Sequence, residues 1–264
     1  NGIWEIRFGG PGQNDKNEEG LSVVQTQDGG IVSIGYSWSF GSSQQIYVTK
    51  TSFYGKELWV KHFGGSNREI GHKSIITSDG NILIVGQTNS PGISHGNDDV
   101  LLQKINQNGD QIWLKAYGQL NHEIGYDVAE TDGGDFLIVG FRDYYEGGKS
   151  LLIIKTDKDG NQIWEKIINE GDNADDIGYS ISKSKIYGFK IIASSNIKDD
   201  DRYNPRVVNI DFDGNVIWDK TFNGNGLKHT RWVASATYDG GAAILGTTNY
   251  WGSVGDNEDI YFFT

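Results

Sequence analysis

The sequence contains no cysteine and no methionine, and only 3 of its 264 residues are proline. The absence of cysteine excludes disulfides, thiolate nucleophiles, iron–sulfur clusters and cysteine-ligated zinc. Apart from short apolar segments there is no long hydrophobic run, so we predict no membrane insertion. Because the chain starts at Asn1 and lacks methionine, we expect a processed product whose signal peptide has been removed.

Positive charge is also scarce. The chain has 23 Lys and Arg against 35 Asp and Glu, a net charge of −12, and no basic run. Nucleic-acid binding needs a cationic patch that neutralises phosphates, so we predict no nucleic-acid partner. What the chain has in quantity is glycine, 37 residues, and aromatic residues, 12% of the total. This composition is typical of many short strands joined by tight turns.

An internal repeat is visible in the tryptophans. Trp4, Trp59, Trp113, Trp164 and Trp218 are separated by 55, 54, 51 and 54 positions. The last four each follow a glycine by four residues, in phrases such as ELWVKHF and QIWLKAY. A fixed period of about 50 residues indicates a repeat architecture.

The rest of each unit repeats as well, and it predicts four strands, which we name a to d. A Thr-containing glycine turn, such as TQDGG, joins strands a and b. A variable loop joins b to c, and a short D-x-x-G-type turn joins c to the Trp strand, d. Strands this short, rich in Val and Ile and arranged in fours, are typical of propeller blades. We therefore predict an all-β, five-bladed β-propeller with four antiparallel strands per blade.

We expect a single domain, 1–264, that closes on itself. The chain starts on a d strand, Ile3 to Phe8, and stops on a c strand, Ile260 to Phe263. The first strand would complete the last blade and remove an open sheet edge. The predicted blades are about 18–63, 69–117, 123–168, 176–222, and 229–264 plus 2–8.

The hairpin from Lys155-Thr156-Asp157 to Trp164 resembles those of quinoprotein-type and Asp-box propellers. The chain as a whole resembles bacterial secreted β-propeller repeat proteins. The resemblance implies a propeller fold and a secreted or cell-surface protein. Quinone-dependent dehydrogenases of that wider group typically have a vicinal cysteine pair at their site, which this chain lacks, so we expect no cofactor. Blade four departs from the pattern, with Ile186-Tyr187-Gly188 in place of the DGG turn.

The variable loops, b–c and d–a, share one face of a propeller, and binding residues concentrate on such loops. Aromatic residues outside the repeat lie in the b–c loops of four blades, whereas blade two has Asn89, His95, Asp98 and Asp99 there. Exposed Trp and Tyr are enriched at recognition sites, although such rings also cover neighbouring loops. The candidate ligand-binding residues are Trp38, Tyr144, Tyr145, Tyr203, His229, Arg231, Trp232, Tyr250 and Trp251.

A repeated acid begins strand a, two residues before a glycine. The four acids are Glu18, Glu69, Glu123 and Asp176, and His229 replaces the acid in the fifth blade. They could ring the channel mouth as a ligand-facing collar. Alternatively each carboxylate accepts N–H bonds within its own d–a loop, and a residue present in every repeat usually serves the repeat.

Metal and catalytic motifs are weak. The five histidines lack metal-site spacing, and the D-x-D-G turns at Asp157 and Asp211 lack the acid that ends a calcium loop. We assign no metal site and leave calcium binding by acidic loops open. We predict a non-catalytic binding module for a glycan or protein, and no enzyme. The alternatives are a protein-docking scaffold and a five-bladed glycoside hydrolase using Glu69, Glu123 or Asp176.

Overall fold

The structure, a computed structural model, describes most of the chain. The described residues are 4–9, 18–41, 43–144, 147–168, 174–184, 188–197, 203–222, 228–236, 242–249 and 258–263. They contain no helix long and apolar enough to cross a membrane. The chain forms two compact units, residues 1–136 with 156–161 and residues 137–155 with 162–264, and each is described by itself.

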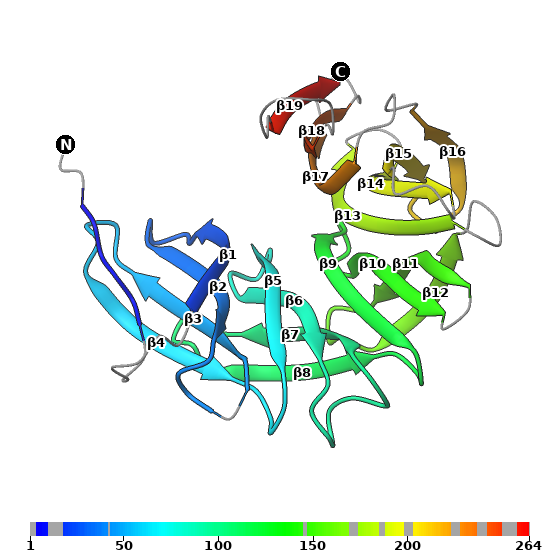
Figure 1. Cartoon of the computed structure of the whole chain (residues 1–264). Coiled ribbons are helices and arrows are strands. Elements are labelled where there is room, and N and C mark those ends of the chain that lie inside the picture. Colours follow the sequence, from blue (N-terminus) through cyan, green and yellow to red (C-terminus); the bar gives the residue numbers. More distant parts are fainter. Residues whose placement is uncertain are drawn as a thin grey trace. The chain divides into compact units, whose positions relative to one another are not determined.

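The described residues form nineteen strands in five sheets, four of four strands and one of three (Figure 1). The first sheet contains β1 (Glu18–Gln25), β2 (Ile31–Ser37), β3 (Gln45–Thr51) and β4 (Glu57–Phe63). The second contains β5 (Glu69–Ile76), β6 (Ile82–Thr88), β7 (Asp99–Ile105) and β8 (Gln111–Tyr117). The third contains β9 (His122–Glu130), β10 (Phe136–Tyr144), β11 (Gly148–Thr156) and β12 (Gln162–Ile168). The fourth contains β13 (Ala174–Ser184), β14 (Gly188–Ile197), β15 (Tyr203–Ile210) and β16 (Val216–Thr221). The fifth contains β17 (Lys228–Ala236), β18 (Ala242–Asn249) and β19 (Glu258–Phe263).

The predicted all-β class and the four-stranded antiparallel unit are confirmed. The bounds of the first four sheets differ from those of the first four predicted blades by at most two residues. The predicted N-terminal strand is wrong for the described residues, because residues 4–9 lie in no strand. A strand requires a hydrogen-bonded neighbour, and no described strand pairs with this segment. The fifth sheet therefore has three strands where four were predicted.

The a–b turns are held by side chains that the repeat supplies. In the first turn Thr26 Oγ1 donates to the Gly30 carbonyl at 3.1 Å, and Gly30 N–H donates to Asp28 Oδ1 at 3.0 Å. The buried ammonium of Lys50, on β3, donates to Asp28 Oδ2 at 2.9 Å. Lys104 and Asp79 form the same ion pair in the second sheet at 2.7 Å. Each turn is thus tied to strand c as well as to its own backbone.

Aliphatic side chains of successive sheets interlock in the first unit. Strands β2 and β3 contribute Val32, Ile34, Ile46 and Val48, all almost fully buried. Strands β6 and β7 contribute Ile82, Ile84, Leu101 and Ile105 to the same cluster. Because β3, β6 and β7 are buried along their whole length, and so on both faces, each of these sheets can pack against a neighbour on either side.

Each of these repeated tryptophans packs against the c–d turn of the next sheet along the chain. A Cβ built on Gly109 would lie 3.2 Å from the Trp59 ring, and one on Gly214 would lie 2.4 Å from the Trp164 ring. Trp113 approaches Gly160 in the same way, and Trp4 approaches Gly55. These turn glycines have φ near +78°, a conformation that side chains with a Cβ rarely adopt. Glycine is required at these turns both by the backbone and by the neighbouring indole.

This packing predicts that Gly214→Ala destabilises the chain more than Gly92→Ala. Both glycines have positive φ, but a Cβ at Gly92 would meet nothing within 4 Å. We expect Gly92→Ala to cost about 1 kcal/mol for the backbone alone, and Gly214→Ala about 2–3 kcal/mol because the Trp164 ring must move. Urea unfolding of the two variants measures the difference. Equal losses would contradict a role for the indole contact.

The a–b turns also predict acid sensitivity. The hydrogen bond from Thr26 and the bond from the Lys50 ammonium lower the pKa of Asp28 to about 2. Since the folded-state pKa lies below the ordinary value of about 3.8, the stabilisation is complete above pH 4 and is lost as the pH falls towards 2. We expect the melting temperature of Asp28→Asn to fall less steeply than that of the parent chain between pH 4 and pH 2. An unchanged slope in the variant would show that this aspartate does not contribute.

Candidate functional site

The acids at the start of strand a form hydrogen bonds or ion pairs within the protein. Glu69 is fully buried; its Oε2 accepts from Gly65 N–H at 2.9 Å and its Oε1 accepts from Thr88 Oγ1 at 2.8 Å. Glu18 accepts bonds from the hydroxyls of Ser37 and Ser39. These bonds lie within the blade or the d–a loop, as the structural interpretation of the repeat predicts.

Asp176 is neutralised by an ion pair in the second unit. Its Oδ2 lies 2.9 Å from Arg206 Nη1, and both side chains are at most 2% exposed. Arg206 also donates to both carboxylate oxygens of Asp219, at 2.9 and 2.6 Å. A carboxylate held in this way fits a structural role better than contact with a ligand.

A different group of charged side chains gathers in the first unit, and we name it the Asp98 cluster. Asp98 lies immediately before β7, in the b–c loop. Arg68 Nη2 lies 2.7 and 2.6 Å from its two carboxylate oxygens, and His122 Nδ1 lies 3.2 Å from Oδ2. Gln87 Nε2 donates more weakly to Oδ1 at 3.4 Å. Residues that are far apart in the sequence, from one loop and two strands, thus converge on one carboxylate.

The cluster continues to the innermost strands. Gln87 Oε1 lies 3.0 Å from His72 Nε2 on β5, and the His72 ring lies 5.1 Å from the ring of Tyr126 on β9. The β5–β6 register shifts between Gly71 and Lys73, which makes His72 the extra residue of a β-bulge. Bulges redirect side chains and are frequent beside functional sites.

Exposure separates the roles within the cluster. The Asp98 side chain is only 5% exposed, whereas Arg68 and His122 are 37% and 43% exposed. Among the described residues no hydrogen bond is formed by Nε2 of His122. The imidazole therefore has one nitrogen fixed by a buried carboxylate and the other left for proton exchange with a ligand or water.

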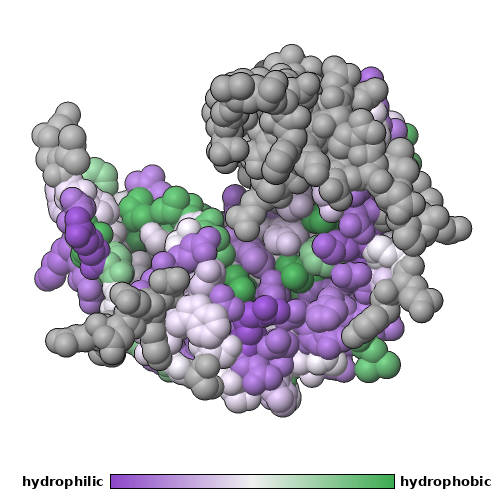
Figure 2. Space-filling view, viewed as in Figure 1, coloured by the Kyte–Doolittle hydropathy of each residue, from purple (hydrophilic) through white to green (hydrophobic). Residues whose placement is uncertain are grey.

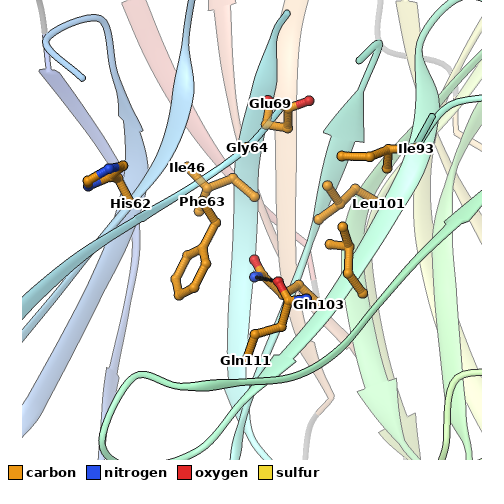
Figure 3. Close-up of a pocket in the computed structure, with 10 residues that line it drawn as sticks. Ile46, His62, Phe63, Gly64, Glu69, Ile93, Leu101, Gln103 and Gln111 are labelled. Carbon is orange, nitrogen blue, oxygen red and sulfur yellow. Dashed lines mark hydrogen bonds between the residues drawn. The ribbon is translucent and has the colours of Figure 1, made fainter. Parts of the chain in front are cut away.

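A cavity of about 210 Å³ lies beside this region, also in the first unit (Figure 3). Glu69 lies at one end of the labelled group, and Gln103 and Gln111 lie at the other (Figure 3). The lining residues are Ile46, His62, Phe63, Gly64, Glu69, Ile93, Leu101, Gln103, Gln111 and Leu114. Both oxygens of Glu69 are already bonded, and Gln103 donates to Gln111 at 2.9 Å. Fewer charged side chains are therefore available to a ligand in this cavity than in the Asp98 cluster. On the face shown in Figure 2, hydrophilic residues cover much of the described surface.

Three of the predicted site residues have described side chains. Trp38 follows β2 in the first unit and is 40% exposed. Tyr144 ends β10 in the second unit and is 36% exposed. Tyr203, also in the second unit, is half-buried, and its hydroxyl lies 3.3 Å from Asp175 Oδ2. Trp38 and Tyr144 retain the accessible rings expected of ligand-contacting residues.

The other predicted residues cannot be placed in a site. The backbone of His229, Arg231 and Trp232 lies in β17, but their side chains lie outside the described residues. Tyr145, Tyr250 and Trp251 lie outside the described residues altogether.

The sequence interpretation noted Asp98 but missed two members of its cluster. Arg68 and His122 each stand directly before the repeated acid of strand a, at Glu69 and Glu123. A basic residue that differs between blades at this fixed position is the sequence feature that could have indicated the cluster. The sequence does not reveal that Arg68 contacts Asp98, because the two residues are 30 positions apart.

No family model matches the chain, and no curated protein matches it. Solved structures do. An α-L-arabinofuranosidase from Fusarium graminearum has a TM-score of 0.59 and 11% identity, covering 89% of this chain and 79% of that one. An α-L-arabinanase from Penicillium chrysogenum has a TM-score of 0.60 and 10% identity, covering 90% and 80%. A subtype N10 neuraminidase-like protein from a little yellow-shouldered bat sample has a TM-score of 0.55 and 10% identity, covering 91% and 78%.

These likenesses concern the fold, and they support the propeller-like interpretation. They also correct two expectations, the non-catalytic binding module and the absence of enzymatic activity. The solved structures that share this fold include an arabinofuranosidase and an arabinanase, two enzymes that act on glycans. The expectation failed because only the symmetric acids were considered as catalytic groups, and the structure shows those acids bonded internally. The charged residues of the blade-two b–c loop, such as Asp98, were not considered as catalytic groups.

Proposed function

We propose that the chain is a glycoside hydrolase whose reaction centre is the Asp98 cluster. The observation that carries the proposal is a nearly buried carboxylate bound by two partly exposed side chains, the Arg68 guanidinium and the His122 imidazole. It lies on the variable-loop side of a fold shared with an arabinofuranosidase and an arabinanase. The substrate class is a glycan.

Hydrolysis of a glycosidic bond adds water across the bond between the anomeric carbon and the leaving oxygen. The leaving oxygen takes a proton, and the attacking water loses one. His122 is the proton-transfer group in this proposal, because Nε2 is available and Nδ1 is held by Asp98. Asp98 is a positioning residue that fixes the orientation of the ring. Arg68 holds both oxygens of Asp98 and presents N–H groups to sugar hydroxyls.

The accessible rings of Trp38 and Tyr144 provide stacking surfaces for sugar units. We keep secretion or cell-surface display, and a bacterial source, as part of the proposal. A secreted enzyme would meet extracellular glycans directly, and a chain without cysteine is insensitive to the redox state outside the cell.

The test is hydrolysis of aryl glycosides and polysaccharides, including α-L-arabinofuranosides and arabinan, followed by release of chromophore or reducing ends. We expect His122→Gln to lower kcat/KM by about 10²–10⁴-fold and to change the shape of the pH–rate profile. Asp98→Asn should lower kcat with a smaller effect on KM, because it removes positioning and not contact. The control is Asp110→Asn, an exposed acid paired with Lys61 outside the cluster.

Two results would contradict this assignment. If no glycoside in the panel is turned over by folded protein, the hydrolase proposal fails. If a glycoside is turned over but both cluster variants match Asp110→Asn in rate and pH profile, the activity stands and the site lies elsewhere.

We further propose that the fold is a five-bladed propeller closed by the N-terminal segment. Trp4 contacts Gly55 as Trp59 contacts Gly109, so residues 4–9 already occupy the place of a d strand relative to the first sheet. The fifth sheet, β17–β18–β19, lacks a d strand among the described residues. Transferring the β7–β8 register to β19 places Arg7 opposite Tyr261.

A chain without cysteine allows a direct test of this closure. We expect the double variant Arg7→Cys with Tyr261→Cys to form a disulfide under mild oxidation and to raise the melting temperature by several degrees. The control, Arg7→Cys with Glu258→Cys, is offset by three residues along β19 and should stay reduced. Similar oxidation of both pairs, or of neither, would contradict closure in this register.

A further inference from the structure

Two fully buried carboxylates face each other in the first unit, beside the Asp98 cluster. Asp99 is the first residue of β7, and Glu123 is the second residue of β9; both are 0% exposed. A Cβ built on Gly118 would lie 2.5 Å from Asp99 Oδ1 and 2.8 Å from Glu123 Oε2. The two oxygens therefore both approach the space that a side chain at residue 118 would need, and this space holds no side chain because residue 118 is glycine.

One of these oxygens has no partner. Asp99 Oδ2 accepts from the backbone N–H of His95 at 2.7 Å and lies 2.8 Å from His95 Nδ1. Asp99 Oδ1 is buried and forms no hydrogen bond. A buried carboxylate oxygen without a donor is unfavourable, and a second carboxylate across the same space increases the penalty. A positive charge between the two groups would relieve both effects.

The repeat contains its own comparison. Gln45 is the first residue of β3, Glu69 the first of β5, and Gly64 follows β4, so these three correspond to Asp99, Glu123 and Gly118. A Cβ on Gly64 would lie 2.4 Å from Glu69 Oε2 and 3.3 Å from Gln45 Nε2. Gln45 is neutral and donates to the Gly65 carbonyl at 3.0 Å. In blade one, the amide of Gln45 lies near Glu69, the first acid of the next blade. In blade two, the carboxylate of Asp99 takes the place of that amide and lies near Glu123.

We propose that Asp99 Oδ1 and Glu123 Oε2 bind a calcium ion. Hard divalent cations take carboxylate oxygens, and calcium tolerates irregular coordination that magnesium does not. No group of three or more His, Cys, Asp or Glu side chains is arranged as a metal site among the described residues. The remaining ligands are therefore main-chain carbonyls and water. The ion would hold β7 to β9, so its effect is on stability, and the proposal does not depend on hydrolase activity.

The experiment uses calcium chloride with the chelator-treated chain, followed by calorimetric titration and thermal unfolding. We expect binding with a rise in melting temperature, and a weaker response to magnesium. Asp99→Gln, which installs the blade-one residue, should lose one bound equivalent. In chelator it should melt at or above the temperature of the metal-free parent. In β19, Asp259 occupies the strand position that corresponds to Asp99 in β7. Because a second calcium ion could bind there, the decisive result is the loss of one bound equivalent and not of all binding.

The matched control is Asp157→Asn, in a D-x-D-G turn that resembles the start of a calcium loop. Asp157 is bonded by Asn161 and by the Asp159 backbone, and the variant should keep the full stoichiometry. Absence of calcium binding by the parent chain would overturn the proposal. Binding that persists in full in Asp99→Gln, or that is lost in Asp157→Asn, would also overturn it.

Discussion

The structure depends on the close approach of each repeated tryptophan to the backbone of the next turn. Trp59, Trp113 and Trp164 lie against turn glycines, and Trp4 lies against Gly55 in the same manner. An indole can lie there only if the turn residue has no Cβ and adopts a positive φ. This requirement accounts for the glycine that recurs in each of these c–d turns. It also places successive sheets so that their aliphatic strands interlock.

Once the sheets are fixed in this way, residues at the same repeat position experience nearly the same surroundings. Glu18 and Glu69 accept bonds from nearby hydroxyl or backbone donors, and Asp176 is paired with Arg206. Equivalent surroundings give equivalent chemistry, whereas acid and base catalysis needs groups in different environments. The informative positions are therefore those where one blade departs from the repeat, such as Arg68, Asp98, Asp99 and His122. All four lie around the same junction of blades two and three.

Much of the fold was predictable because it depends on local and periodic signals. Apolar strands, Thr-Asp-Gly turns and the Trp spacing each act within one repeat, and the strand bounds follow from them. The predicted N-terminal strand is wrong for the described residues, because the pairing that makes a segment a strand is not determined within one repeat. The Asp98 cluster was out of reach for the same reason. Arg68, Gln87 and His122 converge on Asp98 from a loop and two different strands. The sequence does not show that these residues lie together.

The adjacency of Asp98 and Asp99 links the two proposed sites physically. His122 contacts the first aspartate, and its chain neighbour Glu123 faces the second. The Glu123 backbone N–H also donates to the Asp98 carbonyl at 2.7 Å, which ties β9 to the loop that carries both aspartates. An ion held by Asp99 and Glu123 would therefore restrain the same backbone that aims His122 at Asp98. In this arrangement the junction of the two blades, more than either blade alone, determines the geometry of the proposed reaction centre.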